Sequence, residues 1–198
     1  MKQEIILEAA IKRFSHFGIN KTTLTEIADD LALSKQSLCY YFSDKQWLIA
    51  AVEERIVTEY IETLEEAIMH QPSTEAALLK MVEVKMFFFE KYYRLALQVH
   101  NADDGAQGKI ASVKRELMEK ELNLLSGLFE KGMNSKELNP VDVKKTSILL
   151  IDTLLAFAHC VKEKAVIPEH SDFKEILSKQ KDVVSLFYNG LKNQAWSN

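Results

Sequence analysis

Hydrophobic and polar positions follow the period of an α-helix along almost the whole chain, and no segment shows the period of two that a strand requires. Residues 3–17 carry one broad apolar stripe, which predicts an amphipathic helix. The residues of this stripe are Ile6, Leu7, Ala10, Ile11, Phe14 and Phe17. Gly18 is expected to end the helix as a left-handed C-cap, with Ile19 supplying the apolar contact that follows such a cap.

The next stretch, residues 22–45, predicts two short helices joined by a tight turn. Thr23 and Glu26 form a capping box, in which the hydroxyl accepts the third amide and the carboxylate reaches back to the cap amide. Ser34 is a second N-cap, and the helix behind it is expected to bury Leu38. Two helices this short must pack on a neighbour. A short helix, a tight turn and a second helix with a polar outer face is the layout of a DNA-reading helix-turn-helix.

Further helices are expected to fill the rest of the chain. Ser43 and Gln46 form another capping box, which opens a helix of about 25 residues that ends near Pro72. The polar, glycine-bearing segment 101–108 is predicted to be a solvated turn, with an effector entrance or a disordered segment as alternatives. Other predicted boundaries are a C-terminal stop at Gly132, an N-cap at Asn139 with Pro140 in the first turn, and a last helix over residues 172–196.

Composition favours a globular, helix-rich protein. The 198 residues include 47% hydrophobic and 27% charged side chains with three prolines, which excludes a disordered chain. The most apolar stretch, residues 147–161, is too short to span a bilayer, and Glu4 and Glu8 argue against a signal peptide. Cys39 and Cys160 lie far apart and match no zinc spacing, which fits a reducing cytoplasm with no disulfide framework. No metal, no cofactor and no membrane partner are expected.

The order and spacing of the N-terminal residues are those of a known family. Phe-x-x-x-Gly stands at residues 14–18, Thr-x-x-x-Ile-Ala at 23–28, a turn with a serine cap at 33–34, and an aromatic pair followed by lysine at 40–45. In these motifs, which cover about the first quarter of the chain, the sequence resembles the tetracycline-repressor (TetR) family of bacterial transcription regulators.

The resemblance implies an all-α protein in two parts, with about nine helices. Residues 1–46 would form an N-terminal three-helix DNA-binding head containing the helix-turn-helix. A long helix would link this head to a larger C-terminal helical domain for ligand binding and dimerisation, residues 47–198. A homodimer is expected through the last two helices, because one subunit has difficulty covering two such apolar helices alone. Its operator in double-stranded DNA should be a near-palindrome.

The resemblance also assigns DNA contacts. The residues expected at bases or in the groove are Thr25, Lys35, Gln36 and Tyr41. Those expected at phosphates, which fix register without reading sequence, are Thr23, Ser37, Tyr40 and Lys45. Residues 1–50 contain six acidic and six basic residues, so residues 51–198 carry the entire net charge of −4. A head less acidic than the body is weak support for DNA contact.

Two positions depart from the family pattern. Ala32 stands in the turn where the family usually has glycine, although alanine tolerates a left-handed backbone poorly. Cys39 stands where the family usually has a tyrosine that touches the DNA backbone. Cys39 has two interpretations, a small residue packed beside Leu38 or a redox switch on the DNA-binding face. The packed residue is favoured, since only Lys35 is placed to lower the thiol pKa.

The apolar helix that begins near Ser73 also has two interpretations. It can be a buried core helix, or part of its surface can line a cavity for a lipophilic or aromatic effector. The residues assigned to this cavity are Met86, Phe89, Tyr92, Tyr93, His100, Phe157 and His159. In the cavity interpretation His159, with a tyrosine or His100, holds the polar end of the effector. The alternative makes Asp152 and His159 hydrogen-bonded groups at the subunit interface or pocket.

Three classes of function follow, and the sequence separates them unequally. No glycine-rich phosphate loop, nucleophile elbow or His-Glu-x-x-His motif supports an enzyme, so no catalytic residues are assigned. The favoured function is a sequence-specific transcriptional regulator, released from its operator by a ligand and acting as a repressor. The alternative is a non-ligand-responsive DNA-binding or protein-interaction module.

Overall fold

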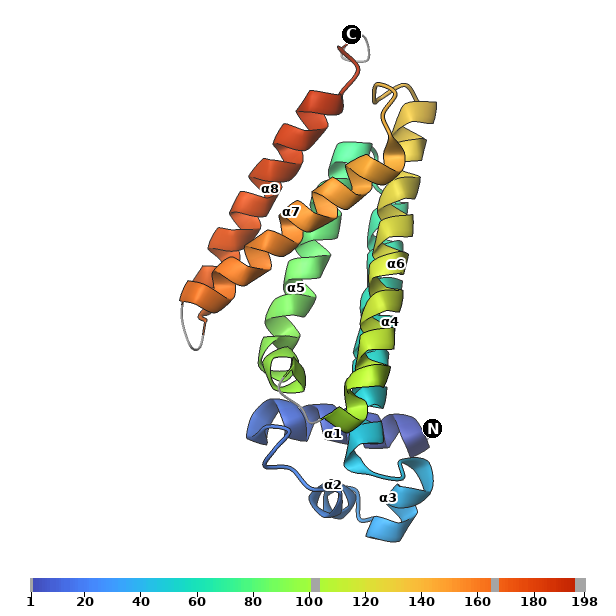
Figure 1. Cartoon of the computed structure of the whole chain (residues 1–198), viewed down its shortest axis with the longest axis vertical. Helices are drawn as coiled ribbons and strands as arrows, with labels where there is room; N and C mark the ends of the chain where they lie inside the picture. The colour runs from blue at the N-terminus through green and yellow to red at the C-terminus, as the bar shows by residue number, and fades with distance from the viewer. Residues whose placement is uncertain (1, 101–103, 165–167, 195–198) are drawn as a thin grey trace. The chain divides into compact units, whose positions relative to one another are not determined.

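The chain is all-α in the part that a computed structural model describes, residues 2–100, 104–164 and 168–194 (Figure 1). Side chains are described for residues 2–98, 108–157 and 168–194. The helices are α1 (Lys2–Phe17), α2 (Leu24–Asp30), α3 (Lys35–Tyr41), α4 (Lys45–Met69), α5 (Thr74–His100), α6 (Asp104–Asn134), α7 (Val143–Lys164) and α8 (His170–Leu191). The predicted fold class is confirmed, and the described residues form eight helices rather than the nine or so that the resemblance implied. None of the described helices has the length and apolar character needed to cross a bilayer.

The chain divides into two compact units, and α4, α5 and α6 contribute to both. The first is made of Met1–Glu59 and Lys91–Leu117, and the second of Tyr60–Glu90 and Met118–Asn198. In the first unit, the core beneath the helix-turn-helix joins α1 to Leu95 of α5 and Ile110 of α6. The head therefore rests on side chains from much later in the sequence. The functional boundary between residues 46 and 47 stays a prediction.

Helix α1 has the predicted buried face with one exception. The buried residues of this face are Ile6, Leu7, Ala10 and Phe14. Gly18 has a φ of +94°, its N–H donates to the Phe14 carbonyl over 3.1 Å, and Ile19 is buried, which confirms the predicted left-handed cap. Phe17 is 53% exposed and does not belong to the buried stripe. Its ring lies 5.4 Å from the Arg13 guanidinium.

Helix α4 is the predicted long helix, at 25 residues, but its cap is different. Asp44 Oδ1 accepts the N–H of Trp47 over 2.8 Å, while the Ser43 hydroxyl donates to Asp44 over 3.2 Å. The predicted capping box of Ser43 and Gln46 is therefore wrong. A carboxylate caps as well as a serine does, and its charge also favours the positive end of the helix dipole.

The second unit contains a buried polar junction at the start of α5. The Glu137 carboxylate accepts hydrogen bonds from the Thr74 N–H at 2.9 Å, the Thr74 hydroxyl at 2.7 Å and the Tyr188 hydroxyl at 2.9 Å. Elsewhere in this unit α7 packs against α8, and Gln180 Nε2 donates to the Leu154 carbonyl over 3.1 Å. The Glu137 junction joins the first turn of α5 to the segment after α6 and to α8.

Two boundaries of α6 differ from the prediction. The helix begins at Asp104, so the predicted turn over residues 101–108 is helical from that residue, and 101–103 lie outside the described residues. Gly132 lies inside α6 and does not end it. A Cβ atom on Gly132 would come within 2.6 Å of Thr74 Oγ1 and 2.7 Å of Leu138 Cδ1, so this glycine is needed for close packing.

The starts of α7 and α8 also differ from the prediction. Asn139 does not cap α7, because the helix begins only at Val143; the Asn139 N–H instead donates to the Leu191 carbonyl over 2.9 Å. Asp142 takes that role, with Oδ1 accepting the N–H of Lys145 over 3.0 Å. Helix α8 begins at His170, and a capping box between Glu169 and Asp172 precedes it. Helix α8 ends at Leu191, with Lys192 as its C-cap, so the predicted continuation beyond that residue is wrong, and residue 196 itself lies outside the described residues.

Candidate nucleic-acid interface

Helices α2 and α3 both begin at the caps that the sequence predicts. Thr23 Oγ1 accepts the N–H of Glu26 over 3.2 Å, and Glu26 Oε2 accepts the N–H of Thr23 over 2.7 Å, which completes the capping box. Ser34 Oγ accepts the N–H of Ser37 over 3.1 Å. These bonds set where each seven-residue helix begins and in which direction it leaves its preceding loop.

The turn between α2 and α3 has a defined backbone conformation despite lacking glycine. Ala32 has a φ of +52°. Its N–H donates to the Asp29 carbonyl over 3.0 Å, and the Leu33 N–H donates to the Ala28 carbonyl over 2.9 Å. This pair of bonds is the Schellman motif. The departure at Ala32 therefore keeps the turn, at a steric cost of about 1 kcal/mol.

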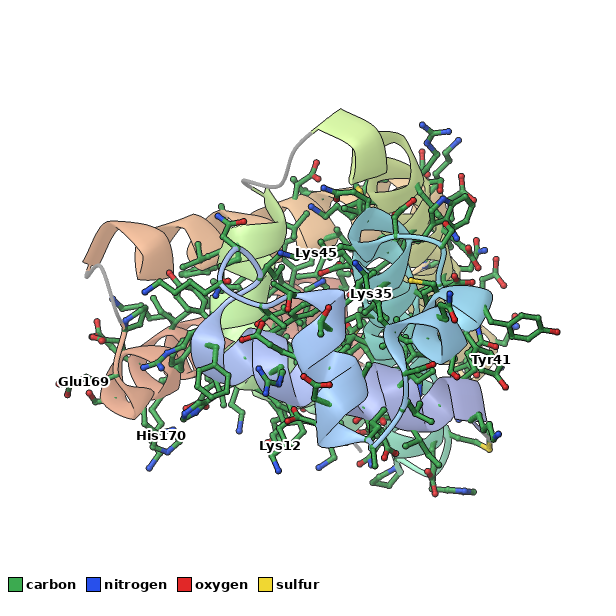
Figure 2. All side chains as sticks on the ribbon, turned by 90° about the horizontal axis from the view of Figure 1, so that it is seen from below. Lys12, Lys35, Tyr41, Lys45, Glu169 and His170 are labelled. Atoms are coloured by element: carbon green, nitrogen blue, oxygen red, sulfur yellow. The ribbon has the colours of Figure 1, made fainter. Side chains whose placement is uncertain are left out.

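The outer face of α3 is polar and exposed, and its inner face is anchored. Leu38 is fully buried and Phe42 nearly so, which confirms the predicted anchors. The exposed residues predicted to contact DNA on α2 and α3 are Thr25, Lys35, Gln36, Ser37, Tyr40 and Tyr41. The rings of Tyr40 and Tyr41 meet edge to face with centroids 5.2 Å apart, and Tyr40 is 84% exposed. Figure 2 shows Lys35 and Tyr41 of α3 together with Lys45 at the start of α4. A short capped helix with long donors on its outer face has the geometry of a recognition helix.

Two of the four predicted phosphate-contacting side chains, those of Thr23 and Ser37, already have hydrogen-bond partners in this conformation. The Thr23 hydroxyl donates to Glu26 Oε2 over 2.9 Å, and the hydroxyls of Ser37 and Ser34 are paired at 2.9 Å. Burial lowers the pKa of Lys45, and the negative charge of Glu26 opposes that shift. A phosphate that binds the Thr23 or Ser37 hydroxyl would therefore have to displace the present hydrogen-bond partner of that hydroxyl. Lys45 is a cation at the start of α4.

The residues predicted to bind an effector are not brought together in one described site. Met86, Phe89 and Phe157 belong to the second compact unit, whereas Tyr92 and Tyr93 belong to the first. Met86 is buried, and the Tyr92 hydroxyl donates to Glu59 Oε2 over 3.2 Å. The side chains of His100 and His159 lie outside the described residues. The effector site stays a prediction.

Two hypotheses on polar residues remain predictions. Cys39 is half-buried on α3, and this burial is compatible with both a packing role and a redox role. Asp152 is exposed on α7, and the side chain of Cys160 lies outside the described residues.

A buried charged cluster in the second unit was missed from the sequence. Glu121 of α6 is 3% exposed and accepts hydrogen bonds from the Tyr60 hydroxyl of α4 and from Lys85 Nζ of α5, the latter at 2.6 Å. Burial, and then the charge of Glu121, raise the pKa of Tyr60. These residues are 36 and 61 positions from Glu121, so no local pattern marks the cluster.

The capped α2 and α3, their fixed turn and the polar outer face of α3 define a helix-turn-helix DNA-binding protein. Residues 6–52 match the family model described as "Bacterial regulatory proteins, tetR family". In this segment the chain is similar to the TetR family of transcriptional regulators.

Similar proteins extend the likeness beyond the head. The chain is 23% identical over 161 residues to the uncharacterized HTH-type transcriptional regulator YhgD of Bacillus subtilis, covering 78% of this chain and 81% of YhgD. A crystal structure of a transcriptional regulator from Cytophaga hutchinsonii is similar with a TM-score of 0.86 and 26% identity, covering 97% and 99% of the two chains. The regulator FadR from Bacillus subtilis, solved in complex with stearoyl-CoA, shares the fold with a TM-score of 0.66 and 18% identity, covering 95% of this chain and 98% of FadR.

Proposed function

We propose that this DNA-binding regulator is a ligand-released repressor that binds a near-palindromic operator as a homodimer. The observation that carries the proposal is the outer face of α3, where Lys35, Gln36 and Tyr41 are exposed on a capped helix. A lysine can donate to the acceptors of guanine, and a glutamine can pair with adenine in the major groove. Such an activity places the protein in the cytoplasm, with the bacterial DNA.

Exposed apolar side chains on the last two described helices support the homodimer. Ile148 and Leu149 of α7 are 40% and 53% exposed, and Leu186 of α8 is 73% exposed. Apolar surface of this kind is commonly covered by a partner, and a second copy would cover it through a two-fold interface. Two recognition helices would then be presented about 34 to 36 Å apart, or further apart for a longer operator.

A lipophilic effector is supported by the apolar character of α5 and by the stearoyl-CoA bound to the similar FadR. To release the protein from DNA, the effector must bind more tightly to a conformation whose recognition helices do not match the operator. An effector with equal affinity for both conformations would shift nothing.

We expect stearoyl-CoA, added to the complex of this protein with a duplex that it selects from random DNA, to weaken DNA binding by about tenfold or more. Coenzyme A without an acyl chain is the matched control and should leave the affinity unchanged, because the proposed pocket is apolar. Fluorescence anisotropy of the labelled duplex measures both effects. DNA binding that neither acyl-CoA nor hydrophobic aromatic compounds alter would favour the alternative, a non-ligand-responsive DNA-binding or protein-interaction module.

A further inference from the structure

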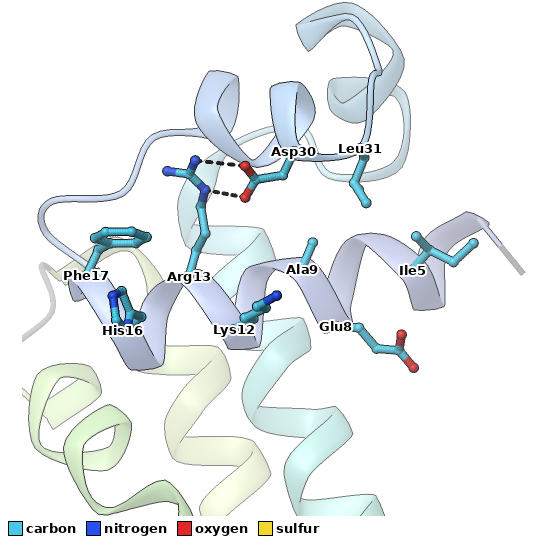
Figure 3. A pocket seen from close by; sticks show the side chains of 9 residues that line it. All are labelled: Ile5, Glu8, Ala9, Lys12, Arg13, His16, Phe17, Asp30 and Leu31. Atoms are coloured by element: carbon cyan, nitrogen blue, oxygen red, sulfur yellow. Dashed lines mark hydrogen bonds and ion pairs between the residues drawn. The ribbon is translucent and has the colours of Figure 1, made fainter.

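Arg13 of α1 reaches across a groove to the end of α2, as Figure 3 shows. Its Nε and one terminal nitrogen donate to the two carboxylate oxygens of Asp30, the latter bond at 2.9 Å. Its other terminal nitrogen lies 3.5 Å from Glu26 Oε1, and the side chain is only 20% exposed. A paired, two-bond contact between guanidinium and carboxylate fixes orientation as well as distance.

The positive charge of Arg13 offsets an excess of negative charge on α2. Its seven residues include the carboxylates of Glu26, Asp29 and Asp30 and no basic residue. Glu26 and Asp30 are four positions apart on one face and repel each other, and Asp30 also stands at the negative end of the helix dipole. The hydrogen bond from Arg13 is the main cause that lowers the pKa of Asp30.

Helix α2 has few fully buried apolar side chains, and Leu24 and Leu31 at its ends are only partly buried against the core. Only Ile27 and Ala28 are buried on this helix, and a helix of seven residues is not stable by itself. The contact with Arg13 ties both the first turn and the last residue of α2 to α1. Because the hydrogen bonds of the turn at Ala32 fix the backbone between the two helices, we expect a rotation of α2 to move α3 with it.

We infer that Arg13 is a positioning residue for the recognition helix: it holds α2, and through the turn α3, at a fixed angle on α1, and does not contact phosphate. This inference rests on the proposed operator binding for its effect on DNA, but not for its effect on the head itself. The Arg13 guanidinium is held by the carboxylates of Glu26 and Asp30. Of the six basic residues of the head, Arg13 is therefore not available to bind phosphates.

The test compares Arg13→Gln with Lys2→Gln, which removes the same charge from an exposed position on the same helix. In Arg13→Gln, amide hydrogen exchange in α2 and α3 should accelerate by about tenfold while that in α4 is unchanged. Affinity for the duplex that the wild type selects should fall by about tenfold, with an unchanged salt slope. Lys2→Gln should leave hydrogen exchange in α2 and α3 at the wild-type rate.

Two further variants keep the inference falsifiable. The charge exchange Arg13→Asp with Asp30→Arg should restore most of the protection and affinity, because it rebuilds the ion pair in reverse. Arg13→Lys, which keeps the charge but loses the paired contact, should lie between the wild type and Arg13→Gln, and it replaces Arg13→Gln if that variant does not fold. Unchanged hydrogen exchange, no recovery in the exchanged pair, or a salt slope lowered by about one would overturn the inference, the last by showing a phosphate contact. If the wild type selects no duplex, the proposed function fails, and the hydrogen-exchange comparison still decides the role of Arg13.

Discussion

Replacing Glu137 with glutamine is expected to lower the free energy of unfolding by about 2 kcal/mol at neutral pH. Glu137 is 4% exposed, and its carboxylate accepts both the N–H and the hydroxyl of Thr74 as well as the hydroxyl of Tyr188. Glutamine has the same shape, but its NH₂ group would face donors where the carboxylate has only acceptors. It also removes a negative charge from the N-terminus of α5.

The loss should depend on pH with a defined sign. Burial alone would raise the pKa of Glu137, but hydrogen bonds from Thr74 and Tyr188 hold it below its ordinary value. A carboxylate whose pKa is lowered by folding stabilises the protein fully above its unfolded pKa of about 4.3, and this contribution disappears as the pH falls through the folded pKa. The difference between wild type and Glu137→Gln should therefore be constant from neutral pH to about pH 5 and shrink below about pH 4.3.

Urea denaturation at a series of pH values measures this difference. Glu130→Gln is the matched control, because Glu130 is exposed on α6 close by in the sequence, and it should track the wild type throughout. A wild-type advantage over Glu137→Gln that persists undiminished into the acid range would show that the charge of Glu137 is not what stabilises the junction.

Gly132→Ala is expected to destabilise the protein by about 2 kcal/mol. A Cβ atom there would lie 2.6 Å from Thr74 Oγ1 and 2.9 Å from Leu138 Cγ, so α6 would have to move away from the start of α5. The Thr74 hydroxyl cannot turn aside freely, because it donates to Glu137. Overpacking of this kind displaces the backbone and its hydrogen-bonded neighbours together.

Gly127→Ala in the same helix is the matched control, and its expected effect has the opposite sign. Nothing lies within 4 Å of a Cβ atom at Gly127, so alanine there should stabilise the helix by up to about 1 kcal/mol. Thermal and urea denaturation of both variants measure the pair. Equal changes in both would show that helix propensity, rather than the contact with Thr74 and Leu138, governs Gly132.

The features that could be predicted from the sequence are those with local causes. The capping box of Thr23 and Glu26, the cap at Ser34 and the left-handed Gly18 each depend on residues within four positions, and all are confirmed. The buried face of α1 followed from helical spacing in the same way, up to Phe17. Phe17 is 53% exposed although Phe14 and Ile19 on either side of it are buried, and helical spacing alone does not reveal this.

The features that could not be predicted depend on partners distant in sequence. Asn139 is a residue type that commonly caps helices, yet its backbone N–H donates to the carbonyl of Leu191, 52 positions later. Gly132 is a residue type that commonly ends helices, yet it lies inside α6, where the close approach of Thr74 and Leu138 leaves no room for a Cβ atom. In the first unit, Arg13 and Asp30 lie on two different helices and form no recognisable sequence motif, although their side chains pair across the groove between α1 and α2.

For the candidate site, the exposure of α3 was predictable and its side-chain pairing was not. Capping and the buried Leu38 determine that Lys35 and Gln36 face outward. The hydroxyls of Thr23 and Ser37 are hydrogen-bonded to Glu26 and Ser34. A motif that assigns these hydroxyls to phosphates takes no account of such neighbouring side chains. The effector residues were assigned from apolar composition, which cannot distinguish a core helix such as α5 from the wall of a cavity.

The outer face of α3 is proposed to read DNA sequence, and equilibrium binding tests this role most directly. The measurement is fluorescence anisotropy of labelled DNA flanking the gene of this protein, at several salt concentrations, with random DNA and Lys35→Ala as comparisons. We expect tight, salt-sensitive binding of two chains per duplex by the wild type, and binding about tenfold or more weaker by Lys35→Ala, with an unchanged unfolding midpoint. Wild-type affinity in Lys35→Ala would contradict the role of α3. Wild-type binding no stronger than to random DNA, both for this fragment and for duplexes selected across the genome, would contradict sequence-specific recognition.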